Sequence, residues 1–330
     1  MTAPPGTASA VLSCGEVLTC ILPSQQPLDA ESAAALLNLR TDERVLVSER
    51  PNLYALSPET LTGVDCALPT ANGAKVRVVG TVAVRATLTE GRVLQTTAYF
   101  RAPADGPERR RAWGHYLMRP GWVEPLGRLP RQEAADGILS GGRPGELDLG
   151  LIADGLLSQL LRHPLLDQAV PFKKSRRTRL RWAALSAPAG PEPGVGPGPS
   201  IQRFTLGEGD LRTIRLSVPD GTQPVAVAGL CEDFALHDWL LTTVVRLLDG
   251  RLGSVEAPTA LTALRPAVEH LMHLWMPRAR GDRTLSTLWD VLEQEPGFTR
   301  QWQSISQRIR DQLALLNTLA PRRVPTGETP

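Results

Sequence analysis

Hydrophobic and polar residues follow two different periods along this chain. In the first part the period is two, which is typical of β-strands. The expected strands are 11–22, interrupted at Gly15, 43–49, 75–88 and 91–101. The last two are joined by Thr89-Glu90-Gly91, which predicts a hairpin. Within 75–88 we expect one face to be apolar and the other, with Arg77 and Arg85, to be wet.

Further along, the period changes to three and four, which is typical of helices. The run from Val225 to Asp249 is the longest apolar-rich stretch and predicts a largely buried helix. We expect it to begin near Gly229–Cys231 and to stop at Gly250. Its charged residues argue against a transmembrane span. Other expected helices follow Asp29, cover 57–61 as a single turn, cover 148–169 with a break at His163-Pro164, and fill much of the chain after residue 250.

These patterns predict an α+β fold, with an antiparallel β-rich N-terminal part followed by a helical C-terminal part. We expect residues 1–10 to be a flexible arm, 11–135 a β-rich domain, and 136–330 an α+β to helical domain. Residues 187–199 are rich in Pro and Gly and predict a disordered linker. Strand-like runs lie on both sides of it, which favours an insertion within one sheet over a domain boundary.

The composition of the chain excludes few functions, but it argues against several kinds of binding and catalytic site. The 330 residues carry a net charge of only +2, so the chain as a whole has no strong field for polyanions. Four cysteines include no C-x-x-C pair, which argues against a zinc ribbon or redox motif and favours a reduced, cytoplasmic protein without membrane contact. No G-K-[ST], G-x-G-x-x-G after a strand, or G-x-S-x-G occurs. We therefore expect no cofactor and no metal.

A first candidate site follows the predicted hairpin, where basic residues lie beside an aromatic one. Its members are Arg109, Arg110, Arg111 and Trp113. Such a combination can bind single-stranded nucleic acid by charge and stacking. The alternative is an exposed loop followed by a strand whose aromatic residues cap the sheet.

A second candidate is the densest basic run of the chain. It comprises Lys173, Lys174, Arg177, Arg179 and Arg181. If the segment is extended, the three arginines share one face and could meet phosphates or an acidic partner. The alternative is a solvated strand edge that its charge protects from pairing.

A third candidate lies on the long helix, where Asp233 and His237 are four residues apart and share a face. With Asp238 nearby, the carboxylates could orient the imidazole as a base or a ligand. The alternative is a pair on a half-exposed rim, or a histidine hydrogen-bonded in a packing interface. No nucleophile is marked beside it.

Four stretches resemble a family of actinobacterial proteins without an assigned activity. They are CGEVLTCIL from Cys14, SERPNLYALSPETLTGVDCALP from Ser48, KVRVVGTVAVRATLTEGRVLQ from Lys75 and CEDFALHDWLLTTV from Cys231. The resemblance covers roughly residues 14–127 and 200–320. It implies a cytoplasmic component encoded in a conserved cluster that includes a variant P-loop ATPase, and it lends no catalytic residues.

Three functions are compatible with these observations. The preferred one is a non-enzymatic assembly or adaptor protein with a protein partner or a homo-oligomeric state. Its helical tail is rich in tryptophan, including Trp239, and interfaces often use Trp and Arg as binding hot spots. The first alternative is nucleic-acid binding through Lys173–Arg181. The second is an enzyme that uses Asp233, His237 and Asp238.

Overall fold

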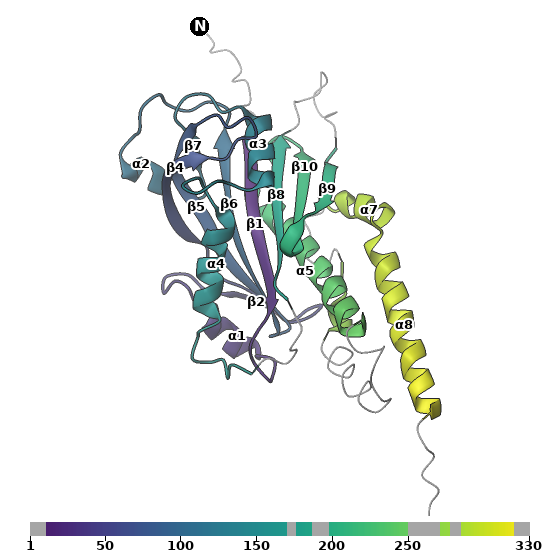
Figure 1. The fold of residues 1–330 in the computed structure, drawn as a ribbon. Helices are drawn as coiled ribbons and strands as arrows, with labels where there is room; N and C mark the ends of the chain where they lie inside the picture. The colour runs from purple at the N-terminus through teal and green to yellow at the C-terminus, as the bar shows by residue number, and fades with distance from the viewer. Residues whose placement is uncertain (1–10, 170–175, 187–197, 250–270, 278–284, 320–330) are drawn as a thin grey trace, which may run out of the picture.

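The computed structural model describes residues 11–169, 176–186, 198–249, 271–277 and 285–319. These residues form a ten-stranded sheet that carries helices on both faces (Figure 1). The strands lie in the order β2-β3-β5-β6-β1-β8-β10-β9, while β4 and β7 both pair with β5. Every pair is antiparallel except β8 with β10, which is parallel. The predicted α+β architecture is confirmed.

The strands are β1 (Val11–Ile21), β2 (Leu46–Ser48), β3 (Tyr54–Leu56), β4 (Thr60–Leu68), β5 (Val76–Thr89), β6 (Val93–Pro103), β7 (Val123–Pro125), β8 (Thr178–Ser186), β9 (Ser200–Leu206) and β10 (Leu211–Val218). The helices are α1 (Ala30–Leu36), α2 (Trp113–Leu117), α3 (Arg131–Ser140), α4 (Leu149–Leu160), α5 (Pro224–Asp249), α7 (Thr287–Gln294) and α8 (Phe298–Leu319), with short 3-10 turns η1 (Glu208–Asp210) and η2 (Met272–Leu274).

The central strand is β1, which pairs with β6 along one edge and with β8 along the other. We expected Gly15 to interrupt this strand, but β1 runs through it. A side chain at Gly15 would overlap the ring of Trp182 on β8. The glycine is therefore required for packing and does not mark a break.

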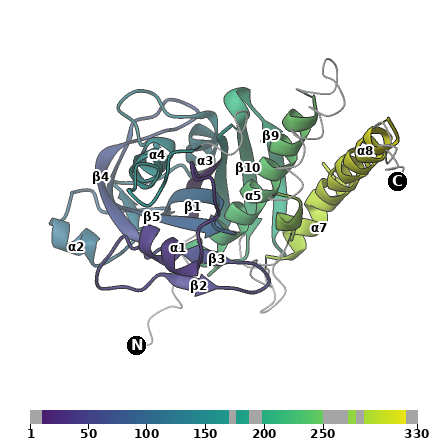
Figure 2. The same cartoon turned by 90° about the horizontal axis from the view of Figure 1, so that it is seen from below.

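Both faces of the sheet are covered by helices, α3 and α4 on one side and α5 on the other (Figure 2). Alternate residues of β1 enter different cores, so Leu18 packs toward α4 and Val17 toward α5. We predicted that one face of β5 is exposed to water, and this prediction is wrong along most of the strand. Arg85 is buried on that face because α5 lies over it, whereas Arg77 near the strand end stays exposed.

The long helix α5 is the central layer of the C-terminal part. It begins already at Pro224, a residue that suits a first helical turn, and not near Gly229–Cys231 as predicted. All residues from Cys231 to Leu241 are buried. The sheet packs against one side of α5, and α7 and α8 contribute Trp289, Phe298 and Trp302 to the same core. The predicted wide burial of this helix is confirmed.

Two further predictions concern segments beside the sheet. The helical turn expected at 57–61 is wrong, because β4 begins at Thr60 and pairs with β5. Residues 1–10 and 187–197 lie outside the described residues, so the flexible arm and the linker stay predictions. The strands on either side of the linker, β8 and β9, belong to one sheet, as an insertion requires. No helix in the described ranges is long and apolar enough to cross a bilayer.

Candidate functional sites

Asp233 and His237 meet on one face of α5 inside the protein. His237 Nδ1 lies 2.7 Å from the carbonyl oxygen of Asp233 and 3.3 Å from its Oδ1. The indole nitrogen of Trp289 donates to Asp233 Oδ2 at 2.9 Å. The rings of Trp275 and Trp289 stand edge-on against the imidazole. This arrangement is that of a histidine hydrogen-bonded in a packing interface.

Asp238 does not join this pair, because the next position on a helix points about 100° away. Its Oδ1 accepts a hydrogen bond from Arg212 Nε of β10 at 2.9 Å. Burial raises the pKa of Asp238, and the guanidinium of Arg212 opposes that rise. The three residues proposed for an enzyme site therefore belong to two separate groups. Trp239, expected as a contact residue, is fully buried and donates to the carbonyl oxygen of Arg176 at 3.0 Å.

A buried ion pair that the sequence pattern did not reveal joins α5 to the sheet. Glu232 accepts two hydrogen bonds of 2.8 Å from Arg85 of β5, one from Nε and one from Nη2. Gln95 of β6 donates to the backbone carbonyl of Glu232 at 2.9 Å. Both charged side chains are almost completely buried. Their role is structural, since they hold α5 over the sheet.

The basic strand β8 holds a second buried charge centre. Glu16 of β1 accepts from Arg179 Nε and from Arg181 Nε, both at 2.7 Å. Arg181 also donates to the carbonyl oxygen of Ile138 in α3 at 3.1 Å. The prediction that this strand presents a basic outer face is therefore wrong. The alternative, a solvated strand edge, is wrong as well. Instead, β8 is an interior strand between β1 and β10, and its arginines face the carboxylate of Glu16.

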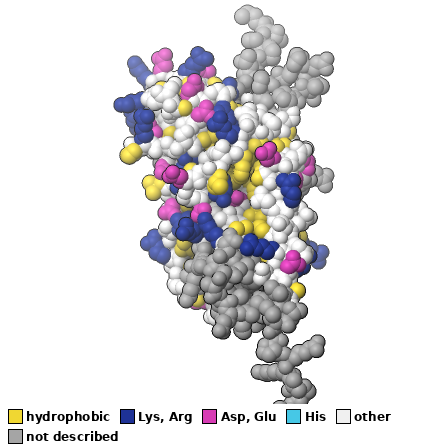
Figure 3. Space-filling model, turned by 45° about the vertical axis from the view of Figure 1, so that its right-hand side comes forward, with side chains coloured by type: hydrophobic (Ala, Val, Ile, Leu, Met, Phe, Trp, Pro, Cys, Tyr) yellow, Lys and Arg dark blue, Asp and Glu magenta, His cyan; other side chains and the backbone are white. Residues whose placement is uncertain are grey.

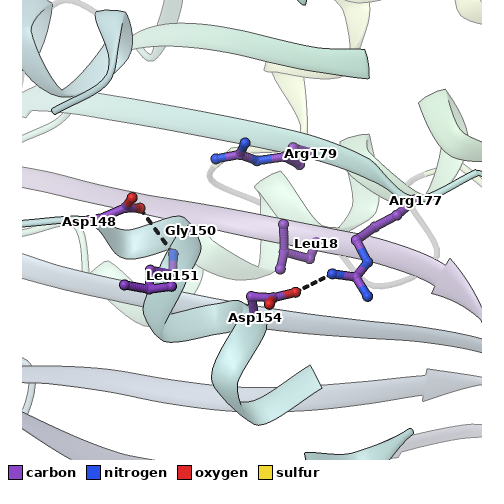
Figure 4. Close-up of a pocket in the computed structure, with 7 residues that line it drawn as sticks. All are labelled: Leu18, Asp148, Gly150, Leu151, Asp154, Arg177 and Arg179. Carbon is purple, nitrogen blue, oxygen red and sulfur yellow. Dashed lines mark hydrogen bonds and ion pairs between the residues drawn. The ribbon is translucent and has the colours of Figure 1, made fainter. Parts of the chain in front are cut away.

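Beside this centre a small cavity of about 260 Å³ opens between β1, β8 and α4. Arg177 turns toward Asp154 of α4, with which it forms an ion pair (Figure 4). Asp148 caps α4 by accepting from the backbone nitrogen of Leu151 at 3.0 Å (Figure 4). Two arginines and two aspartates line the cavity, so it has no preference for anions. Lys173 and Lys174 lie outside the described residues.

The first candidate site forms a projecting lobe. We call residues 107–120 the α2 lobe. The loop is exposed and leads into β7, as predicted, but the short helix α2 within it was not predicted. Tyr116 is buried at its base, and its hydroxyl accepts from the backbone nitrogen of Arg111 at 3.0 Å. His115 Nε2 and Arg119 Nη1 lie 3.1 Å and 2.9 Å from Glu124 Oε1, which ties the lobe to β7.

The outer surface of the α2 lobe is both apolar and basic. Trp113, Leu117 and Met118 are 39%, 57% and 79% exposed. The ring of Trp113 packs across Gly63 of β4, and the guanidinium of Arg110 lies 5.0 Å above it. The lobe carries four arginines and a single glutamate, hence a formal charge of +3, against +2 for the whole chain. The α2 lobe therefore carries a local excess of positive charge.

Reactive groups of other kinds are scarce. Cys14, Cys20 and Cys231 are buried, and burial raises the pKa of each thiol, that of Cys20 to about 12. Within the described residues no three His, Cys, Asp or Glu side chains are placed to hold a metal ion. Comparison with models of protein families, with curated proteins and with solved structures finds no match for this chain.

Proposed function

We propose that this protein is a non-enzymatic assembly protein that binds a protein partner through the α2 lobe. The observation that carries the proposal is the exposure of Trp113, Leu117 and Met118 on a lobe that also carries four arginines. Contiguous apolar residues at a surface mark interaction sites, and Trp and Arg are enriched in binding hot spots. The positive charge of the lobe favours an acidic partner surface.

The lobe is also well ordered for binding. Tyr116 and the contacts of His115 and Arg119 with Glu124 fix its base, so association loses little conformational entropy. Arg110 is held between Asp65 of β4 and the Trp113 ring. Arg109, by contrast, is exposed and has no charged partner in the described part of the chain. It is therefore available to a carboxylate of the partner.

A cytoplasmic place fits this proposal, because the four cysteines are all free. The resemblance to actinobacterial cluster proteins suggests that the partner is the product of a neighbouring gene. The P-loop ATPase is the first candidate. The buried positions of Asp233, His237 and Asp238 favour an adaptor over an enzyme, since those side chains support packing.

The test compares two matched sets of substitutions. The lobe variant combines Arg109→Glu with Leu117→Ser, and the control variant combines Arg44→Glu with Leu46→Ser. Leu46 on β2 is 60% exposed and Leu117 57%, so both variants remove a similar exposed leucine and reverse one exposed arginine. Each purified neighbouring gene product is titrated against both variants by calorimetry. We expect the lobe variant to raise Kd by about tenfold or more and the control to leave it unchanged.

The same variants separate this proposal from binding of nucleic acid by the α2 lobe itself. A labelled single-stranded oligonucleotide that binds the unchanged protein, with salt-sensitive affinity, and not the lobe variant would replace the protein partner with nucleic acid. Equal binding of a partner to both variants would locate the interface elsewhere and contradict the role of the α2 lobe.

A further inference from the structure

The strand β4 forms an edge of the sheet next to the α2 lobe (Figures 1 and 2). Its pairing with β5 is regular over all 9 residues and contains no bulge. Residues 61–63 are exposed, and the side chain of Leu61 is among them at 37%. In the described part of the chain no strand pairs with the outer side of β4. Only an isolated bridge joins Ala67, near its end, to Glu146.

The alternation of the ladder shows which backbone groups of β4 point outward. In an antiparallel pair, successive residues direct their N–H and C=O groups to opposite sides of the strand. Thr81 of β5 donates its N–H to the carbonyl oxygen of Trp122 at 3.0 Å, on the side away from β4. Its neighbour Gly80 therefore bonds toward β4, where its partner is Val64. The even-numbered residues of β4 are thus bonded to β5, and the odd-numbered residues point outward.

Leu61, Gly63 and Asp65 consequently each present one N–H and one C=O group at the outer side of β4. None of these backbone groups has a hydrogen-bond partner among the residues that the structure describes. Ala67, the next residue of the same set, confirms the direction, because its carbonyl oxygen accepts from the backbone nitrogen of Leu147 at 2.8 Å. The edge is therefore a row of donors and acceptors that an added strand can use.

Proteins usually protect the outer strands of a sheet by shortness, charge, proline or bulges. The outer strand β2 has only 3 residues. The outer strand β9, on the side of the molecule that Figure 3 brings forward, carries Arg203, pairs irregularly with β10 and packs against α7. In contrast, β4 is long and regular and contains no proline, lysine or arginine. It is thus the outer strand best suited to accept another strand.

The α2 lobe gives this edge an apolar surface. The ring of Trp113 lies over Gly63, at 3.4 Å from the place that a side chain there would occupy. Because side chains alternate between the faces of a strand, Leu61 lies on the same face as this ring. Residues of an added strand that lie opposite Leu61 and Gly63 would therefore contact apolar groups.

Further along the strand the surface is basic. Asp65 pairs with both Arg77 and Arg110, which remain 63% and 42% exposed, so one positive charge is in excess at this position. A carboxylate of the added strand would balance it. A second copy of this chain does not suit the edge, because antiparallel pairing of two β4 strands would bring two α2 lobes of charge +3 together on one face of the sheet.

We propose that the protein partner adds an extended segment to β4 as a new edge strand, with apolar residues opposite Leu61 and Gly63 and an acidic residue opposite Asp65. In strand addition of this kind, backbone hydrogen bonds supply affinity and alternate side chains supply specificity. The inference rests on the proposed function, because it describes how a partner of the α2 lobe is held.

A synthetic peptide tests the edge directly. The sequence Thr-Glu-Thr-Val-Thr-Val-Thr, acetylated and amidated, places its glutamate opposite Asp65 and its valines opposite Gly63 and Leu61 when it pairs antiparallel to β4. A control peptide carries methyl groups on the backbone nitrogens of the glutamate and both valines, so it keeps the side chains but loses the donors that face β4. We expect saturable binding of the first peptide and at least about tenfold weaker binding of the control.

Amide resonances of the isotope-labelled full chain locate the bound peptide. We expect solvent exchange of the amide protons of Leu61, Gly63 and Asp65 to slow when the peptide binds. The amide protons of Thr62 and Val64 should be protected with and without the peptide, because they are bonded to β5. Equal binding of the methylated peptide, or unchanged exchange at the three outward residues, would overturn strand addition.

Two variants at one position separate the backbone from the side chain. Leu61→Pro removes one outward N–H, a change that edge strands tolerate, whereas Leu61→Ala removes the side chain and keeps the N–H. We expect Leu61→Pro to bind the peptide at least about tenfold more weakly than Leu61→Ala, with circular dichroism confirming the fold of both. Equal binding by the two folded variants would contradict the inference. Binding of a neighbouring gene product that depends on the α2 lobe, together with no binding of the peptide, would overturn strand addition alone and leave the proposed function standing.

Discussion

Arg85, Arg181 and Arg212 are buried, and each reaches a carboxylate on another element of the fold. A buried charge without its partner is far more costly than the pair is stabilising. These arginines therefore fix which elements can pack together. They also explain why so many basic residues of the chain are not available to external ligands.

The first prediction concerns the pair of Arg85 and Glu232. Arg85→Met leaves the Glu232 carboxylate buried and unpaired, and should lower the free energy of unfolding by about 3–5 kcal/mol in a denaturant titration. The double variant Arg85→Met/Glu232→Leu removes both charges and should lie within about 1 kcal/mol of the unchanged protein. A single variant as stable as the double would show that the pair is not desolvated as described.

The second prediction concerns the thiols. The thiolate is the reactive form, and burial raises the pKa of all four cysteines, so little thiolate forms at pH 8. In a thiol assay with Ellman's reagent, the native protein should react slowly at the half-buried Cys66 alone, and all four thiols should react after unfolding in urea. Cys66→Ser should abolish the native signal. Rapid reaction of two or more native thiols would contradict the burial of β1 and α5.

At the scale of elements, the sequence predicted those with strong local patterns. The hairpin of β5 and β6 and the long helix α5 follow from alternation and from steps of three and four. The contacts that each element makes with the rest of the fold did not follow from these patterns. Arg85 looked like a wet residue because the pattern of one strand cannot show that α5, more than a hundred residues later, lies over it. Contacts between residues that are far apart in the sequence therefore could not be predicted from local patterns.

The candidate sites show the same limit. Arg179 and Arg181 were recognised as sharing a face, but their partner Glu16 is far away in sequence. The α2 lobe was recognised by Arg109–Arg111 and Trp113, whereas Leu117 and Met118 were missed. Two adjacent apolar residues carry no periodic signal, so their exposure is visible only in the fold.

The third prediction tests how α4 is seated on the charged centre. A methyl group at Gly150 would lie 2.6 Å from Glu16 Oε1 and 2.7 Å from Arg179 Nη2, whereas one at Gly155 would meet nothing within 4 Å. Gly150→Ala should destabilise the protein by about 1–3 kcal/mol. Gly155→Ala on the same helix should stabilise it by about 0.5–1 kcal/mol through helix propensity. Thermal unfolding should therefore shift in opposite directions, and a stabilising Gly150→Ala would refute the close approach.

At the scale of the whole molecule, the described strands form one continuous sheet. The surfaces at its two ends differ. The α2 lobe lies beside β4 and β7 (Figure 1), and at the other end residues of β9, β10, α5 and α8 line an apolar cavity of about 510 Å³. Between them, two apolar cores and the buried ion pairs hold the helices against the sheet. Such a layout suits a protein that holds a partner at one end while its other end remains accessible.

The central claim is that this protein forms a defined complex through the α2 lobe. Size-exclusion chromatography with light scattering, on the protein alone and mixed with each neighbouring gene product, tests it most directly. We predict a complex of fixed mass that is lost in Arg109→Glu/Leu117→Ser and kept in Arg44→Glu/Leu46→Ser. A species of 35.7 kDa in every mixture would contradict the claim.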